Sequence, residues 1–130
     1  MPDSTATILI IDNDDGLVTA ISARLEHLGY HCVKASSGAQ GVAAFQEQRI
    51  DLVITDLNMP AGNGITLTKT LRRTSSVPII IATGFHEEFG RELRSVKNVT
   101  IVEKPFSADQ LIDLVEADLV MAGCELPDND

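Results

Sequence analysis

Cysteine and long apolar runs are both scarce in this 130-residue sequence. It holds two cysteines, Cys32 and Cys124, and neither has the spacing of a metal-binding or redox motif. Two free thiols in a reducing compartment are the simplest interpretation, so we expect a cytoplasmic protein. The apolar runs are short, as at residues 8–11 and 77–82, and none approaches the ~20 residues that cross a bilayer. The N-terminus also lacks the basic and apolar regions of a secretory signal.

Positive charge is scarce as well. Ten Lys and Arg residues stand against nineteen Asp and Glu residues, which gives a net charge of −9. Such a charge opposes binding to nucleic acid or to an anionic membrane, so we expect neither as a partner.

No repeat, low-complexity tract or internal linker divides the sequence. We therefore predict one domain over residues 7–122, between an N-terminal tail (1–6) and an acidic C-terminal tail or cut linker (123–130).

Five short apolar segments, rich in β-branched residues, predict buried strands at residues 7–11, 32–35, 52–55, 78–82 and 99–102. The segments between them have helical spacing, which is weakest around residues 87–96. The apolar positions with this spacing are Leu17, Ile21, Leu25 and Leu28; Val42 and Phe45; Ile65, Leu67 and Leu71; and Leu111, Val115 and Leu119. Apolar strands that alternate with helices form a parallel sheet covered on both faces. The sequence therefore predicts an α/β fold, a (βα)5 doubly wound, five-stranded parallel sheet in the flavodoxin-like order 2-1-3-4-5.

Polar side chains stand at the carboxyl ends of four predicted strands: Asp12, Asp56, Thr83 and Lys104. In the order 2-1-3-4-5 these ends are neighbours, so two carboxylates, a hydroxyl and an ammonium converge on one edge of the sheet. Carboxylates held together repel each other unless a cation lies between them, and Mg²⁺ prefers such oxygen ligands. The group suits phosphoryl chemistry, because it offers an aspartate nucleophile, neutralising positive charge and a hydrogen-bond donor for the transferred group.

The sequence resembles the receiver domain of bacterial response regulators, the phosphoacceptor module of two-component signalling. The resemblance runs from about residue 7 to about residue 122 and rests on four motifs in order. They are Ile8-Leu-Ile-Ile-Asp12; Asp51-Leu-Val-Ile-Thr-Asp56-Leu-Asn-Met-Pro60 followed by Gly64; Pro78-Ile-Ile-Ile-Ala-Thr83-Gly84; and Glu103-Lys104-Pro105-Phe106. It implies a signalling module that promotes its own phosphorylation and dephosphorylation rather than an enzyme. It also implies a cis peptide bond before Pro105, which turns the preceding lysine inward.

By this resemblance Asp56 is the phosphoacceptor and takes a phosphoryl group from a phosphohistidine of a histidine kinase or a histidine phosphotransfer protein. Mg²⁺ is the implied cofactor, held by Asp12, Asp56 and the backbone carbonyl of Asn58. Lys104 is implied to pair with a phosphoryl oxygen or with Asp56. Thr83 is implied to hydrogen-bond the phosphoryl group and to couple it to a face made by the fourth helix, fifth strand and fifth helix. A downstream protein target or a homodimer contact is expected there.

Three positions depart from the family pattern. Asn13 stands where the family usually has a second acidic residue, so metal affinity should fall. Ile101 stands where the family most often has a Tyr or Phe that changes rotamer on activation, and Gly84 stands where Ala is usual. Asn13 and Ile101 keep open a degenerate receiver that acts as a phosphorylation-independent docking module. A flavodoxin-like cofactor binder is another alternative, but acids rather than a phosphate-binding loop follow the first strand.

The remaining polar residues favour structural interpretations. Asp14 and Asp15 fall where the first helix should start and are expected to cap it, although compensation for Asn13 through water stays an alternative. The three histidines, His27, His31 and His86, have no metal-binding spacing and are expected at the surface or in turns. The last predicted helix is apolar over more than one stripe, which indicates either an interface or ordinary variation.

Overall fold

The computed structural model describes residues 5–56, 64–84 and 96–123. Five parallel strands form one sheet in the order β2-β1-β3-β4-β5. The strands are β1 (Thr7–Ile11), β2 (His31–Ala35), β3 (Leu52–Asp56), β4 (Ile79–Thr83) and β5 (Val99–Glu103), and the described helices are α1 (Asp15–His27), α2 (Gly38–Glu47), α3 (Gly64–Arg72) and α5 (Ala108–Met121). The predicted fold class and strand order are confirmed. The helix predicted around residues 87–96 falls almost entirely outside the described residues.

Several strand bounds differ by one residue from the prediction. The strands β3, β4 and β5 each continue one residue further, because the ladder pairs Asp56 with Ala82 and Thr83 with Glu103. At its start, β4 excludes Pro78, which has no N–H to donate, although its carbonyl accepts from Val53 N at 3.0 Å. The aspartate and threonine of the candidate site are therefore the last residues of their strands.

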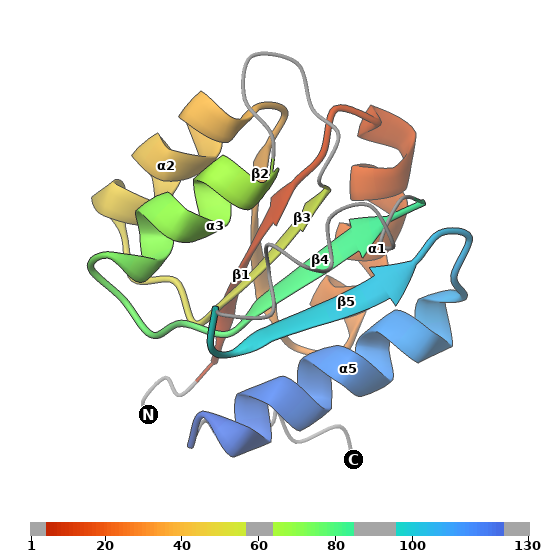
Figure 1. Cartoon of the computed structure of the whole chain (residues 1–130). Helices are drawn as coiled ribbons and strands as arrows, with labels where there is room; N and C mark the ends of the chain where they lie inside the picture. The colour runs from red at the N-terminus through yellow and green to blue at the C-terminus, as the bar shows by residue number, and fades with distance from the viewer. Residues whose placement is uncertain (1–4, 57–63, 85–95, 124–130) are drawn as a thin grey trace.

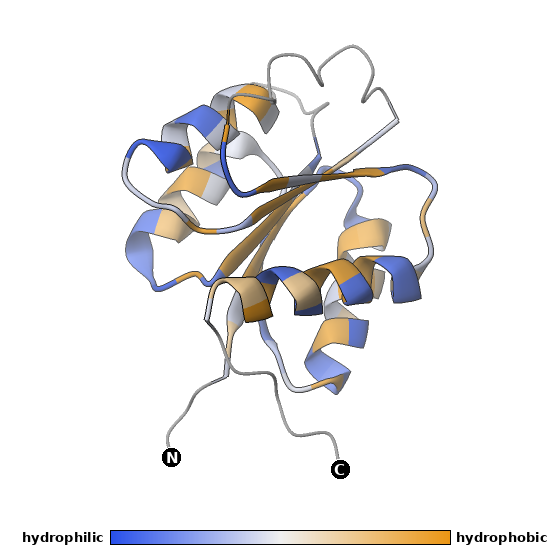
Figure 2. Ribbon diagram, turned by 60° about the horizontal axis from the view of Figure 1, so that its bottom comes forward, coloured by the Kyte–Doolittle hydropathy of each residue, from blue (hydrophilic) through white to orange (hydrophobic). Residues whose placement is uncertain are grey.

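The sheet is buried on both faces. Helices α1 and α5 cover one face, and α2 and α3 cover the other (Figure 1). Successive residues of β1 alternate between the two cores: Ile8 and Ile10 pack with α1 and α5, whereas Leu9 and Ile11 pack with α2 and α3. Figure 2 shows the apolar strands enclosed between the two helical layers. Burial on both faces explains why the inner strands β1, β3 and β4 are apolar at nearly every position.

Helix starts follow the local sequence. The Asp14 carboxylate accepts a hydrogen bond from Leu17 N at 3.1 Å and is the N-cap of α1, so its predicted capping role is confirmed. Asp15 is the first residue of that helix, where negative charge is favourable near the N-terminus of the helix dipole. Serines cap two other helices in the same way, Ser37 before α2 and Ser107 before α5.

Gly41 allows α2 to approach β1 closely. A Cβ at this position would clash with Cδ1 of Ile11 and lie 2.9 Å from its Cγ1, and Ile11 is fully buried. We expect Gly41→Ala to lower the free energy of unfolding by about 1–2 kcal/mol, because overpacking outweighs the better helix propensity of alanine. Urea unfolding measures this loss.

Gly16 provides the matched control in α1. A Cβ there would meet only the Asp14 carboxylate, at the ordinary contact distance of 3.4 Å. Gly16→Ala should therefore leave stability unchanged or raise it by up to about 1 kcal/mol. If both glycine variants shift the urea midpoint in the same direction, the close approach of α2 is not what requires glycine at position 41.

Cys32 makes stability depend on pH in the alkaline range. Burial, with a smaller contribution from the charge of Glu26, raises the pKa of its thiol from 9.0 to about 12, while Lys34 opposes the shift. Above pH 9 the unfolded chain loses this proton and the folded chain keeps it, so stability falls as pH rises towards 12. In Cys32→Ala this part of the loss, about 1–3 kcal/mol, should be absent. Urea unfolding of both proteins under reducing conditions, from pH 7 to pH 11, tests this; parallel curves would contradict it.

The surface agrees with some of the remaining expectations. His27 and His31 are exposed, while His86 lies outside the described residues. Val120 and Met121, at the end of α5, are 55% and 87% exposed, and an interface on this helix stays one of the two alternatives that the sequence left open. None of the described helices has both the length and the apolar character needed to cross a bilayer.

Candidate functional site

The strand register brings the candidate site residues to one edge of the sheet. Ile11 of β1 pairs with Thr55 of β3, so Asp12 and Asp56, each one residue further on, end neighbouring strands. On the other side of β3, Asp56 pairs with Ala82, which immediately precedes Thr83. The carboxyl ends of β1, β3 and β4 thus present two carboxylates and a hydroxyl side by side.

Lys104 adds positive charge from β5. Its Nζ donates to Asp12 Oδ2 at 3.2 Å and to Asp56 Oδ2 at 3.3 Å. Its backbone N–H donates to the carbonyl of Thr83 at 2.9 Å, which fixes the chain where β5 ends. The peptide bond between Lys104 and Pro105 is cis, as predicted. One ammonium at the end of β5 therefore joins two carboxylates at the ends of the neighbouring strands β1 and β3.

The three charged groups lie in a partly desolvated pocket. Asp12 and Asp56 are 5% and 8% exposed, and the side chain of Lys104 is 29% exposed. Burial alone would lower the pKa of Lys104, but the charges of Asp56 and Asp12 and the hydrogen bonds to both carboxylates together outweigh it and raise the pKa above its usual value. Lys104 is therefore an ammonium at neutral pH. Two carboxylates and one ammonium leave one negative charge in the pocket, which attracts a further cation.

Two threonines complete the described part of the site. Thr83 is fully buried at the end of β4. Thr55, which the sequence analysis did not single out, is also buried, and its hydroxyl donates to the carbonyl of Asp56 at 3.0 Å. The sequence feature that could have indicated a role for Thr55 is its polar side chain within an otherwise apolar strand. The hydroxyl holds the backbone at the point where the chain leaves β3.

The donor set fits a hard divalent cation. Asp12 and Asp56 offer carboxylate oxygens, the ligand type that Mg²⁺ prefers. The third predicted ligand, the carbonyl of Asn58, falls outside the described residues. Within the described ranges no three His, Cys, Asp or Glu side chains are grouped as a metal site by themselves. The two aspartates are therefore the described part of the predicted magnesium site.

Two of the departures from the family pattern have clear structural settings. Asn13 is exposed beside the pocket. Its neighbour Asp14 accepts from Leu17 N as the helix cap and donates its own N–H to Asp12 Oδ1 at 3.0 Å. Asp14 thus supports the backbone around Asp12, and its carboxylate already accepts the capping hydrogen bond from Leu17 N. Ile101 is half-buried and packs against the core beneath α2 and α3.

Comparison with known families gives a direct answer. Residues 8–116 match the family model described as the response regulator receiver domain. The chain belongs to this family. It is 32% identical to the phosphate regulon transcriptional regulatory protein PhoB of Pseudomonas aeruginosa over 121 residues, covering 90% of this chain and 53% of that protein. It is 36% identical to the transcriptional regulatory protein GlrR of Escherichia coli over 84 residues, 64% of this chain and 19% of that protein.

Solved receiver structures agree with the fold. The chemotaxis response regulator CheY4 of Vibrio cholerae is 27% identical, with a TM-score of 0.81 over 88% of this chain and 98% of that chain. The receiver domain of the hybrid histidine kinase CckA is 26% identical, with a TM-score of 0.76 over 88% of this chain and 99% of that chain. The chain spans about half or less of the curated relatives described above, but nearly all of these solved receiver chains. It is a receiver domain, a signalling module of two-component systems.

Proposed function

We propose that this receiver domain accepts a phosphoryl group on Asp56 from a phosphohistidine of a histidine kinase or a histidine phosphotransfer protein. An oxygen of the Asp56 carboxylate attacks phosphorus, so that an O–P bond forms while the N–P bond of the phosphohistidine breaks. The electron pair of the broken bond stays on the donor histidine. The product is an acyl phosphate on the receiver.

The observation that carries this proposal is the position of the Lys104 ammonium, 3.2 Å from Asp12 and 3.3 Å from Asp56. It orients the nucleophile and offers positive charge to an incoming phosphoryl oxygen beside two buried carboxylates. Asp12, Asp56 and the carbonyl of Asn58 would hold Mg²⁺, which supplies further positive charge for the phosphoryl oxygens when bound.

Thr83 is proposed to donate a hydrogen bond to the transferred group. It is the last residue of β4 and pairs with Glu103 of β5. A movement of Thr83 towards the phosphoryl group would therefore displace β5 and, through it, α5. We propose this face, together with the predicted fourth helix, as the surface that contacts the downstream protein or a second copy.

Intact-mass spectrometry after incubation with a small phosphodonor, with and without Mg²⁺, tests the proposal. The expected result is a labile adduct of one phosphoryl group that depends on Mg²⁺. The second candidate, a docking module that works without phosphorylation, is favoured by Asn13 and by Ile101 in place of the switching aromatic residue. A protein that gains no adduct at any Mg²⁺ concentration would support this second candidate.

A further inference from the structure

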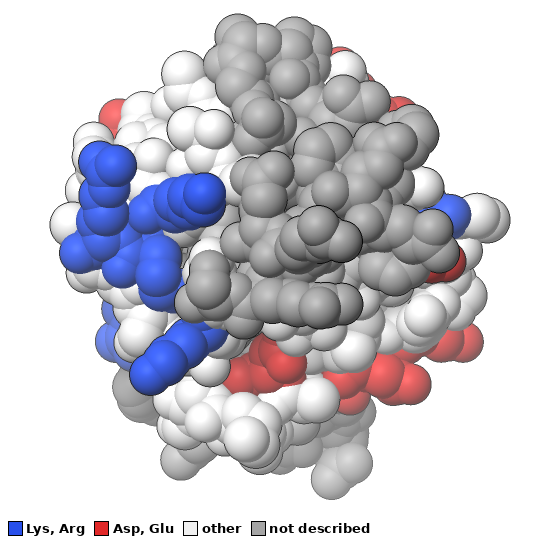
Figure 3. Space-filling model, viewed as in Figure 1, with Lys and Arg blue, Asp and Glu red and all other residues white. Residues whose placement is uncertain are grey.

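Among the described residues of this acidic chain, positive charge gathers beside the end of α3. A hollow of about 400 Å³ is lined by Lys69 and Arg72 of α3, by Arg73 directly after it, and by Val96 and Lys97, which precede β5. We call these five residues the basic groove. Figure 3 shows Lys and Arg side chains clustered on the left of the view, beside α3.

The basic groove lies at the opposite edge of the sheet from the phosphoacceptor pocket. Arg72 Nη1 donates to the carbonyls of Ser75 at 3.0 Å and Val77 at 2.7 Å, just before β4 begins. Its Nη2 donates to the carbonyl of Asn98 at 3.3 Å, just before β5 begins. The phosphoacceptor pocket, in contrast, is built where the same two strands end. A ligand in the basic groove would therefore not touch the aspartates.

Arg72 shapes the groove rather than offering a free cation. Its guanidinium ties the end of α3 to the starts of two strands through the three carbonyls. Burial lowers its pKa. Its Nε is buried without a hydrogen-bond partner among the described residues. This half-buried arginine places the end of α3 beside Lys97, although the two segments are far apart in the sequence.

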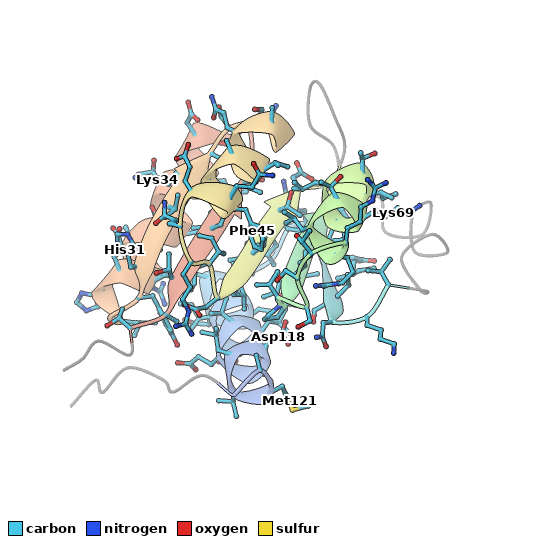
Figure 4. All side chains as sticks on the ribbon, turned by 90° about the vertical axis from the view of Figure 1, so that its left-hand side faces the viewer. His31, Lys34, Phe45, Lys69, Asp118 and Met121 are labelled. Carbon is cyan, nitrogen blue, oxygen red and sulfur yellow. The ribbon has the colours of Figure 1, made fainter. Side chains whose placement is uncertain are left out.

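The other three cations, Lys69, Arg73 and Lys97, are exposed. Within the described part of the chain none of them forms an ion pair, whereas Arg24 and Arg49 pair with Asp109 and Asp51. Lys69 extends outward from α3 in Figure 4. Like charges so placed repel one another, and an anion bound between them would relieve the repulsion.

We propose that the basic groove docks a short acidic segment of a partner protein. The positive charge of the groove favours an acidic occupant. The negative charge of the rest of the chain limits how long that occupant can be. Apart from the four cations of the groove, the sequence holds six Lys and Arg residues against nineteen Asp and Glu residues, a balance of −13. A long polyanion such as nucleic acid would extend into that field and be repelled, whereas a few carboxylates on a flexible segment need only cover the groove.

A fluorescein-labelled peptide of eight glutamates, followed by fluorescence anisotropy at low salt, tests the proposal. The groove variant carries Lys69→Ala, Arg73→Ala and Lys97→Ala. The control variant carries Arg24→Ala, Lys34→Ala and Arg49→Ala, three exposed cations elsewhere; Lys34 and Lys69 lie on opposite sides of Figure 4. Each variant loses three charges from −9, so both carry −12. We expect the groove variant to bind the peptide about tenfold more weakly than wild type and the control variant less than about twofold more weakly.

A second measurement does not depend on the variants. In an NMR titration of the wild type, amide shifts should move for residues 69–73 and 97, and they should move equally in Asp56→Asn, since the proposed site is remote from the phosphoacceptor pocket. Equal losses in the two triple variants, absence of peptide binding to the wild type, or shifts confined to other residues would overturn the proposal. Tighter binding of an oligonucleotide of eight thymidines than of the peptide would also overturn it and indicate a nucleic-acid site.

Discussion

Asp56→Asn should abolish the phosphoryl adduct that the wild type gains from a small phosphodonor in the presence of Mg²⁺. An amide oxygen is a weak nucleophile and cannot form the acyl phosphate that a carboxylate forms. Asparagine has nearly the same shape as aspartate, so the end of β3 and its pairing with Ala82 should be preserved. A missing adduct in the mass spectrum therefore indicates the loss of the nucleophile and not a loss of folding. Far-UV circular dichroism verifies that the variant is folded.

The control is Asp109→Asn. This aspartate is exposed on α5, with a side chain 86% exposed, and its ion pair with Arg24 is at the surface. Its removal costs the chain the same unit charge without touching the pocket, and such a surface pair contributes little to stability. Labelling should be unchanged in this variant. Equal labelling of Asp56→Asn and wild type would show that the phosphoryl group goes to another residue.

Most of the fold could be predicted because both faces of the sheet are buried. Burial on both faces makes the inner strands β1, β3 and β4 apolar at nearly every position, so they stand out from the amphipathic helices that separate them. The bounds were wrong by one residue at several strand ends because the ladder, and not composition, decides where a strand stops. Asp56, Thr83 and Glu103 are polar, yet each is held in the ladder by a partner on the next strand.

The convergence of Asp12, Asp56 and Lys104 could be predicted because parallel strands all end at the same edge. The hydrogen bond from Thr55 to the carbonyl of Asp56 could not, since it depends on a rotamer. The basic groove was also missed, because it joins the end of α3 to the start of β5. The net charge of −9 describes the average of the surface and hides a local cluster of the opposite sign.

Asn13→Asp should tighten Mg²⁺ binding roughly tenfold. Asn13 is exposed beside the pocket, so an added carboxylate attracts the cation through solvent at high dielectric, by about 1–2 kcal/mol after hydration losses. In the wild type, the neighbouring carboxylate of Asp14 does not replace the missing negative charge at position 13. The carboxylate of Asp14 caps α1 through Leu17 N and is held at the helix start. Isothermal titration calorimetry with Mg²⁺ measures the change in affinity.

A charge-neutral control separates position from total charge. The double variant Asn13→Asp with Asp15→Asn keeps the net charge at −9 and only moves one carboxylate from the first residue of α1 to position 13. If a carboxylate at position 13 acts directly on the metal, the double variant should keep most of the tenfold gain and should also be phosphorylated at lower Mg²⁺ than wild type. If the double variant binds Mg²⁺ only as tightly as wild type, the gain in Asn13→Asp comes from the total charge of the chain and not from position 13. If Asn13→Asp binds Mg²⁺ no better than wild type, position 13 faces away from the metal, and the missing acid does not weaken this receiver.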